Sequence, residues 1–208
     1  MSRYEALCAV AGPVSRETFD KLLAFETIFR KWAARINLAA PSTLSELWTR
    51  HILDSAQLLS LARDAKRWAD IGSGGGFPGA IMAILLNDQL DSSIILIESN
   101  GKKAAFLRNV LADLAGRARI APERAETVIS AQPAPDVVTA RAVAPLRDLL
   151  TLTEPWMEAG TRALFHKGRD FRSEVKSASD TWNLDLVEHR SAVDPLSVVL
   201  EIDRIRRV

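Results

Sequence analysis

The sequence predicts an α/β fold, with a mostly parallel sheet, helices on both faces and a small helical cap before it. Short apolar runs alternate with amphipathic segments from residue 67 to the end of the chain. Five of the ten glycines fall between Gly72 and Gly79, directly after the first apolar run. Residues 1–65 carry no strand signal. We therefore expect a helical cap over 1–65 and the sheet domain over 66–208.

Composition restricts the class of protein and its partners. The 208 residues suffice for one α/β domain with an appendage. The 27 basic and 26 acidic residues give a net charge of +1, so a nucleic-acid ligand would need a local basic patch. The single cysteine, Cys8, excludes an internal disulfide. Because no apolar run reaches the roughly 18 residues of a membrane span and no signal peptide is apparent, we expect a cytoplasmic protein without a membrane partner, and a monomer.

The cap is expected to consist of three helices. Amphipathic periodicity predicts the first over residues 15–37, with Ser15 as its N-terminal cap. Its apolar positions are Phe19, Leu22, Leu23, Ile28, Phe29, Trp32 and Ile36. Pro41 interrupts this pattern, so a second helix is expected near Thr43 and a third near Asp54.

From residue 67 onward the expected strands and helices alternate, which favours a parallel sheet with right-handed crossovers. Strands are expected over 67–71, 92–99, 118–121, 136–141 and 162–168. Helices are expected over 78–86, 102–114, part of 123–135, 145–157 and 171–180. The last two strands, 183–190 and 197–205, are joined by a loop too short for a crossover. We therefore predict that they form an antiparallel pair at the edge of the sheet.

The glycine-rich stretch between residues 71 and 79 is the first candidate site. Glycine is needed where the backbone turns through a positive φ or comes close to a ligand. The frame GxGxG, formed by Gly72, Gly74 and Gly76, begins at the strand exit. A shifted GxGxxG frame from Gly74 to Gly79 is the dinucleotide fingerprint, but it leaves Gly72 unexplained. We therefore prefer the first frame.

The acid at the end of the first strand helps to choose the ligand. Asp70 stands two residues before Gly72, where it would repel a pyrophosphate. The same carboxylate suits the ammonium and sulfonium groups of S-adenosylmethionine. We therefore expect S-adenosylmethionine, contacted by Asp70 and the loop glycines, in preference to NAD. The remaining alternative is a glycine turn that only packs the helix on the strand.

In a parallel sheet the ligand lies at the carboxyl ends of the strands. Glu98 ends the second strand, 24 positions after Gly74, which is the spacing of a carboxylate that accepts both ribose hydroxyls. The alternative is an ion pair of Glu98 with Lys102 or Lys103. The ends of the later strands supply Ala125, Glu126, Arg141 and Lys167.

Basic residues in and near the cap are candidates for contacts with RNA phosphates, provided that they share one face. They are Arg30, Lys31, Arg35, Arg50, His51 and Lys167. The alternative is a solvated face that also suits the negative end of a helix dipole. His51 has no cysteine or second histidine nearby, so we expect no metal site.

Several of these segments together resemble a known family. They are DIGSGGGFPG (70–79), ERAE (123–126), TARAVAPL (139–146), FHKG (165–168), INLAA (36–40) and RHILDS (50–55). They are similar to segments of the bacterial small-subunit rRNA guanine-N7 methyltransferases, the RsmG or glucose-inhibited division protein B family. The resemblance covers nearly the whole chain in order, and the Phe-Pro-Gly after the glycines is its most specific part.

The resemblance implies a class I methyltransferase fold, S-adenosylmethionine as cofactor, and 16S rRNA or the small ribosomal subunit as partner. The implied acceptor is a guanine in the decoding-region loop. Carried over by position, the family's cofactor contacts fall on Gly72, Phe77, Ala125, Glu126 and Arg141. Phe77 is also a candidate for stacking on a base that is turned out of the RNA.

The expected chemistry requires no general base, because guanine N7 carries a lone pair and no proton. We accordingly assign no catalytic residue and expect catalysis by positioning, which can supply up to about 7 to 11 kcal/mol. Two alternatives stay open at this point. One is a methyltransferase for a small metabolite, which the same loop allows. The other is a nucleotide-binding protein without catalysis.

Overall fold

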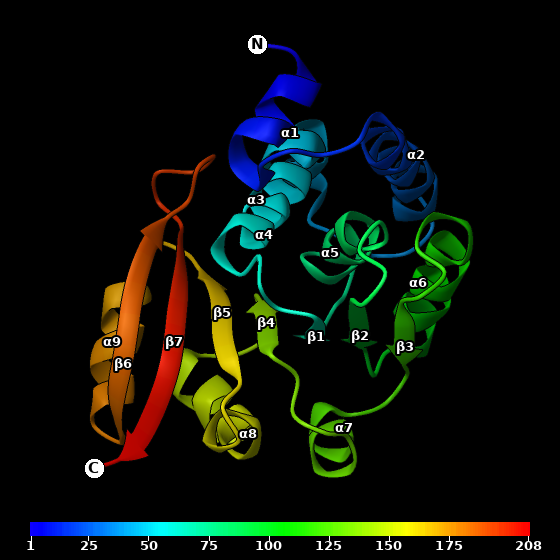
Figure 1. The fold of residues 1–208 in the computed structure, drawn as a ribbon. Coiled ribbons are helices and arrows are strands. Elements are labelled where there is room, and N and C mark those ends of the chain that lie inside the picture. The colour runs from blue at the N-terminus through cyan, green and yellow to red at the C-terminus, as the bar shows by residue number, and fades with distance from the viewer.

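The computed structural model describes residues 1–208. Its strands form one seven-stranded sheet in the order β3-β2-β1-β4-β5-β7-β6. Helices cover both faces (Figure 1). The strands are β1 (Arg67–Ile71), β2 (Ser93–Ile97), β3 (Arg119–Ala121), β4 (Val137–Arg141), β5 (Arg162–Lys167), β6 (Trp182–Arg190) and β7 (Val198–Arg207). The predicted fold class is therefore confirmed.

Helices and helical turns occupy most of the remaining chain. They are α1 (Arg3–Ala11), α2 (Arg16–Ala33), η1 (a 3₁₀ helix, Pro41–Glu46), η2 (a π-helix, Trp48–Leu53), α3 (Asp54–Ala56), α4 (Leu58–Leu61), α5 (Gly79–Leu86), α6 (Gly101–Leu114), α7 (Ala125–Ala131), α8 (Leu146–Glu158) and α9 (Phe171–Ser179). None of them combines the length and the apolar character that crossing a membrane requires.

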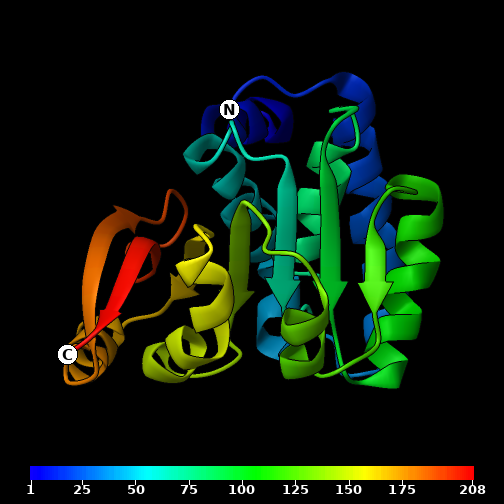
Figure 2. The same cartoon turned by 60° about the horizontal axis from the view of Figure 1, so that its bottom comes forward.

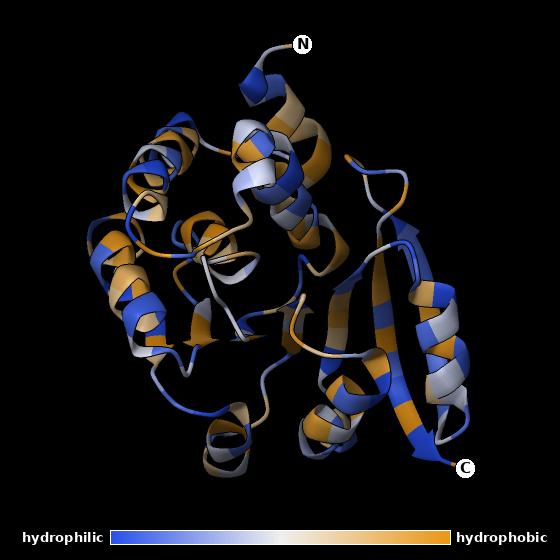
Figure 3. Cartoon of the chain, turned by 180° about the vertical axis from the view of Figure 1, so that it is seen from behind, coloured by the Kyte–Doolittle hydropathy of each residue, from blue (hydrophilic) through white to orange (hydrophobic).

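The direction of each strand follows from the connection before it. β1 to β5 pair in parallel, and each connection between consecutive strands contains a helix; Figure 2 shows β1 to β4 side by side. Residues 191–197 hold no helix, so β7 turns back on β6 and inserts between β5 and β6. The predicted antiparallel pair at the edge is confirmed. The end of β7 is mostly polar, with single apolar residues between the polar ones (Figure 3).

The sheet separates two hydrophobic layers. Because side chains alternate along a strand, Trp68 and Leu96 face the core shared with α1 to α6, whereas Ala69 and Ile97 face the core under α7 to α9. α5 is apolar all round and every one of its residues is buried, as expected of a helix that lies between other elements. It occupies the space between the sheet and the N-terminal helices.

The N-terminal helices are part of the first layer. α2 packs on α5 and α6, and α1 packs on α3 and α4. Helix α1 was not among the predicted elements, although the capping box formed by Ser2 and Glu5 marks its start. The division at residue 65 remains a prediction, since side chains from both sides of it share one core.

Candidate functional site

The loop between β1 and α5 adopts the backbone conformation that its glycines predict. Gly72, Gly74 and Gly76 have φ values of 64°, 54° and 94°, in the left-handed region that favours glycine. A Cβ at Gly72 would lie 2.6 Å from the side chain of Val143. A Cβ at Gly74 would meet only the carbonyl oxygen of Gly72, at 3.7 Å. The side of the loop at Gly74 is therefore open.

The other side of this loop is packed against protein. A Cβ at Gly75 would lie 2.6 Å from the carbonyl oxygen of Leu38, in the connection after α2. A Cβ at Gly76 would lie 2.6 Å from the Cβ of Ala80. Gly76 is buried and packs closely on α5, and its expected role as a ligand contact stays a prediction.

Phe77 also lies on the packed side. Its side chain is buried, and its ring centroid lies 5.1 Å from that of Phe29 and 4.8 Å from that of His51. Both neighbours belong to the N-terminal helices. The ring is therefore enclosed and is not free to stack on a base, whereas the expected contact of Phe77 with the cofactor stays a prediction.

Asp70 lies beneath the loop rather than in the cleft, which corrects its expected role as a ligand contact. The residue is fully buried. Its Oδ2 accepts a hydrogen bond from the Gly79 N–H (3.1 Å), and its Oδ1 accepts one from the Thr139 hydroxyl (2.7 Å). Burial raises the pKa of Asp70 to about 6 although these hydrogen bonds oppose the shift. The carboxyl group thus joins β1, β4 and the start of α5.

Glu98, at the end of β2, holds the open side of the loop. Its Oε2 accepts a hydrogen bond from the Gly74 N–H and its Oε1 accepts one from the Asn100 N–H, each at 2.7 Å. Both carboxylate oxygens are thus bound by backbone N–H groups, and the alternative ion pair with Lys102 or Lys103 is not formed. Because each carboxylate oxygen has two acceptor sites, Glu98 keeps capacity for donors on a ligand.

Four of the expected cofactor contacts meet in a cavity of about 340 Å³ at the carboxyl ends of β1 and β2, whereas Gly74 is not part of its lining. Gly72, Glu98, Ala125 and Glu126 line it. These residues come from three different strand-to-helix connections, so the sheet topology brings them together as the strand-end rule predicts. Arg141 is absent from the lining of this smaller cavity.

A larger cavity of about 450 Å³ adjoins the smaller one at the ends of β4 and β5. The two share Val143 and Ala144, in the loop after β4. Arg141 lies in the larger cavity together with His166 and Lys167 from β5. The cleft therefore has two compartments that meet at one loop.

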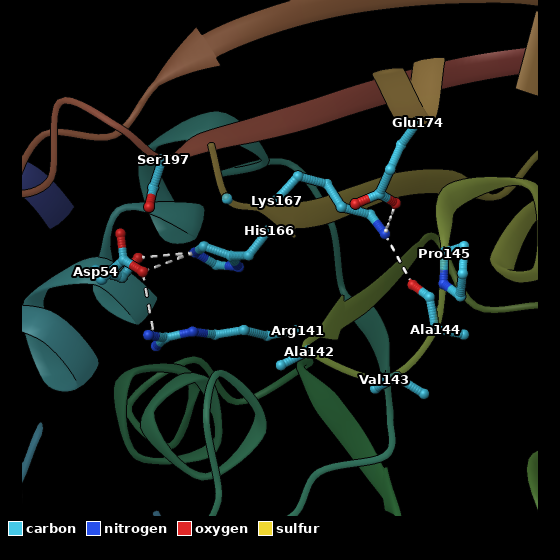
Figure 4. Close-up of a pocket in the computed structure, with 11 residues that line it drawn as sticks. Asp54, Arg141, Ala142, Val143, Ala144, Pro145, His166, Lys167, Glu174 and Ser197 are labelled. Carbon is cyan, nitrogen blue, oxygen red and sulfur yellow. Dashed lines mark hydrogen bonds and ion pairs between the residues drawn. The ribbon is translucent and has the colours of Figure 1, made fainter. Parts of the chain in front are cut away.

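Asp54, at the start of α3, organises one wall of the larger cavity (Figure 4). Its Oδ1 accepts hydrogen bonds from Gln57 Nε2 (2.7 Å) and from the Ser191 hydroxyl (2.8 Å). Its Oδ2 lies 3.6 Å from Arg141 Nη1 and 3.8 Å from His166 Nε2. One buried carboxylate thus faces side chains from β4, β5 and the loop between β6 and β7.

Arg141 reaches across from the sheet to the N-terminal helices. Its Nη2 donates a hydrogen bond to the carbonyl oxygen of Arg50 (2.9 Å). Its Nη1 is buried and has no hydrogen-bond partner. The guanidinium therefore retains a donor that can bind a ligand.

Asp54 and His166 are not among the site residues that the sequence predicts. Asp54 is an acid among apolar residues on an expected helix, and both residues stand in segments that carry the family resemblance, RHILDS and FHKG. These signals were present in the sequence. The contact between them joins positions 112 residues apart, which neither periodicity nor local motif spacing indicates.

Two of the candidate phosphate contacts are corrected by the structure. Lys167 is buried, and its Nζ binds the Glu174 carboxylate (2.7 Å) and the carbonyl oxygen of Ala144 (2.8 Å). Burial, followed by the charge of Arg141, lowers the pKa of His51 to about 4. At neutral pH the first cation is already paired and the second side chain is uncharged.

The remaining candidate cations differ in how strongly neighbouring groups bind their side chains. Arg30 binds the Glu26 carboxylate (2.7 Å) and the carbonyl oxygen of Leu44 (2.7 Å), so it braces the N-terminal helices. Arg50 is exposed beside Glu46 at 3.4 Å. Lys31 and Arg35 are exposed near the end of α2. Their role toward RNA stays a prediction.

Comparison with known sequences identifies close relatives along the whole chain. The family model described as "rRNA small subunit methyltransferase G" matches residues 18–197. A ribosomal RNA small subunit methyltransferase G of Chelativorans sp. (strain BNC1) is 57% identical over 206 residues, covering 99% of this chain and 98% of the relative. The protein of that description from Brucella anthropi is 55% identical over 206 residues, covering 99% and 97%.

Solved structures support the fold at low sequence identity. A methyltransferase from Geobacter sulfurreducens has a TM-score of 0.59 at 15% identity, covering 89% of this chain and 88% of that one. A putative O-methyltransferase from Klebsiella pneumoniae has a TM-score of 0.57 at 14% identity, covering 97% and 96%. These similarities show the class I methyltransferase architecture and no finer property.

Proposed function

The chain belongs to the family of rRNA small subunit methyltransferase G, and from this premise we propose that it methylates N7 of a guanine in the decoding-region loop of 16S rRNA. The methyl donor is S-adenosylmethionine. The observation that carries the proposal is the pair of adjoining cavities, which share Val143 and Ala144. The smaller compartment suits the methyl donor and the larger one suits the acceptor base. The donor and the base would then meet at the shared loop.

The smaller compartment has the chemical groups that S-adenosylmethionine requires. Glu98 retains acceptor sites for the ribose hydroxyls, and the open face at Gly74 lets a flat ligand approach the backbone. Arg141 lines the adjoining larger compartment, and its Nη1 makes no hydrogen bond although it lies 3.6 Å from the Asp54 carboxylate. We propose it as the cation that binds the carboxylate of the amino-acid portion across the shared loop. When bound, the donor supplies an electrophilic methyl group on a sulfonium.

The larger compartment holds the acceptor base. Guanine N7 attacks through its own lone pair, so the protein neither removes nor donates a proton in this step. Its residues contribute by aligning N7 with the methyl group, an effect of up to about 7 to 11 kcal/mol in favourable cases. We propose that no metal takes part, because the positive charge passes from the sulfonium to the purine and no negative charge develops that a Lewis acid would stabilise.

We propose that the protein works as a monomer in the cytoplasm, where small subunits are available as substrate. The monomer is supported by the surface, where the exposed large apolar side chains Leu90, Val143, Val187 and Leu196 lie on separate segments. Sedimentation of the free protein tests this state.

The activity is tested on small-subunit RNA from a strain that lacks this protein. We expect one guanine to lose its N7 methyl group, and the wild-type gene to restore it. Purified protein with S-adenosylmethionine labelled in the methyl group should modify small subunits from that strain at the same position. If N7 methylation of small-subunit RNA is unchanged in the strain, the proposed function is wrong and a small-metabolite acceptor becomes the better candidate.

A further inference from the structure

One buried polar atom in the larger cavity has no hydrogen-bond partner in the protein, although the cleft chemistry described above does not use it. His166, on β5, is 6% exposed, and its Nδ1 is buried and unpaired. Leaving such an atom without a partner is costly. An unpaired buried group that lines a cavity indicates a ligand that supplies the missing partner.

The hydrogen bond on the other side of the ring determines what Nδ1 can do. His166 Nε2 lies 3.0 Å from the backbone carbonyl oxygen of Asp54. A carbonyl oxygen only accepts, so Nε2 carries the hydrogen. Burial lowers the pKa of His166, and the charge of Arg141 adds to this, while Asp54 opposes it. The ring is neutral at pH 7, and Nδ1 is a bare acceptor.

The surroundings hold this ring in one orientation. Asp54 is fixed by Gln57 and Ser191, and Gln57 Oε1 in turn accepts a hydrogen bond from the Ala192 N–H (3.0 Å). In Figure 4 the ring presents Nε2 to Asp54, so that Nδ1 lies on the opposite side. Asp54 therefore positions the ring through its backbone carbonyl oxygen, 3.0 Å from Nε2, and through its carboxylate, 3.8 Å from Nε2, while His166 lines the cavity.

The order of the strands places this acceptor relative to the methyl donor. The sheet runs β2-β1-β4-β5 across the cleft, with the donor compartment at β1 and β2 and His166 at β5. Consider a guanine that lies between the donor compartment and His166 and presents N7 to the methyl donor. Around the rim of its ring, O6 follows N7, and N1–H follows O6 on the edge that points away from the donor. The Watson–Crick edge, which carries the N1–H group and the N2 amino group, is thus the part of the base that comes nearest to β5.

We infer that His166 Nδ1 accepts a hydrogen bond from N1–H of the acceptor guanine and makes the site specific for that base. The inference rests on the proposed function, because it assumes a guanine methylated at N7. An adenine placed in the same way presents the lone pair of N1, so two acceptors face each other. A buried mismatch of this kind is strongly rejected.

The direct test compares two acceptors on the wild-type protein. Small-subunit RNA is assembled by ligation with guanine or 1-methylguanine at the methylated position, reconstituted into small subunits and assayed with labelled donor. Because 1-methylguanine lacks the N1–H group, we expect its transfer rate to be about 10- to 100-fold lower. Equal rates for the two acceptors would overturn the inference.

Two variants then identify the protein partner. His166→Gln keeps an N–H donor for the Asp54 carbonyl oxygen but removes the Nδ1 acceptor. We expect guanine to be methylated about 10- to 100-fold more slowly, and 1-methylguanine to react at its wild-type rate. His166→Asn, which keeps a polar atom at the place of Nδ1, should recover part of the rate with guanine. A loss that affects both acceptors equally would reduce His166 to a structural residue and overturn the inference.

The failure of this inference is distinguishable from the failure of the proposed function. If wild-type protein methylates no guanine at N7, the proposed function fails. If it methylates guanine and 1-methylguanine alike, only the role of His166 fails. Calorimetric titration with S-adenosylmethionine should give the same affinity for wild type and His166→Gln, since His166 lies outside the lining of the donor compartment.

Discussion

At the residue scale, Asp70 and Glu98 have different roles although each lies at the end of a buried strand. Asp70 points under the loop, where Gly79 and Thr139 donate to it, and Glu98 points to the open side, where Gly74 donates to it. The difference arises because Asp70 is completely enclosed whereas Glu98 borders a cavity. Only Glu98 can therefore receive hydrogen bonds from a ligand.

The buried carboxyl of Asp70 predicts a pH effect on stability. Its pKa rises from 3.8 to about 6 on folding, so its neutral form is favoured in the folded state. The stability that this proton provides is fully present below about pH 4 and is lost as the pH rises to about 6. Between these values the free energy of unfolding of the wild type, relative to Asp70→Asn, should fall by up to about 3 kcal/mol. Urea denaturation of both proteins from pH 4 to 7 measures this.

Asp136 is the control for this measurement, since its pKa is lowered in the folded protein by hydrogen bonds from Arg67 and Lys66, which outweigh desolvation. Its contribution is present above its unfolded pKa and is lost as the pH falls. Between pH 4 and 7 this contribution is nearly constant, so the difference between Asp136→Asn and wild type should be almost independent of pH and should shrink only below about pH 4. A pH-independent difference for Asp70→Asn would contradict the account of the buried carboxyl.

The open side of the loop gives a second prediction at this scale. A valine at position 74 would extend into the space that the proposed donor uses, and the φ of 54° also disfavours a side chain. We expect Gly74→Val to abolish binding of S-adenosylmethionine in calorimetry. Gly160→Val is the matched control, because Gly160 has a φ of 97° and open space around it but lies away from the cleft. Normal affinity in Gly74→Val would refute the loop assignment.

At the scale of elements, the loop between β1 and α5 is pressed between the sheet and the N-terminal helices. Phe77 packs on Phe25 and Phe29 from α2, with ring centroids 5.8 and 5.1 Å apart. Gly75 leaves room for the carbonyl oxygen of Leu38. The N-terminal helices therefore set the position of the loop that faces the donor.

This packing predicts that a single methyl group at Gly75 lowers stability. In Gly75→Ala the added Cβ would lie 2.6 Å from Leu38 O and 2.9 Å from the Phe29 ring. We expect the free energy of unfolding to fall by about 1 to 3 kcal/mol, the usual cost of overpacking. Gly101→Ala is the control, because no atom lies within 4 Å of its added Cβ and it is the first residue of α6. A control as unstable as Gly75→Ala would show that the loss does not come from this contact.

At the scale of the whole molecule, the charge is nearly balanced, with 27 basic and 26 acidic residues. Long-range attraction of RNA is consequently weak. Of the candidate cations in the N-terminal region, Lys31 and Arg35 are exposed, whereas Arg30 is bound by Glu26 and Leu44. RNA binding should therefore depend on a few local charges.

The corresponding prediction concerns the salt dependence of RNA binding. Replacing Lys31 and Arg35 together by alanine should weaken binding of small subunits and reduce the slope of log K against log salt by about 1 to 2. His51→Gln should leave the slope unchanged at pH 7, because the pKa of His51 is about 4. Filter binding across a salt series measures both. An unaltered slope in the double variant would assign these two residues to an ordinary solvated surface.

The sequence by itself determined the alternation of strands and helices, the positive φ values in the glycine loop and the antiparallel pair at the edge. Each of these features depends on periodicity or turn chemistry within a few residues. The segments around Gly72 and Arg141 also show the resemblance to the family. The tertiary structure alone decided that Asp70 turns away from the cleft, that Phe77 is enclosed, that Lys167 is paired with Glu174, and that Asp54 meets His166. These facts depend on how α3, α5 and the strand ends pack together, and contacts between distant segments leave no periodic pattern in the chain.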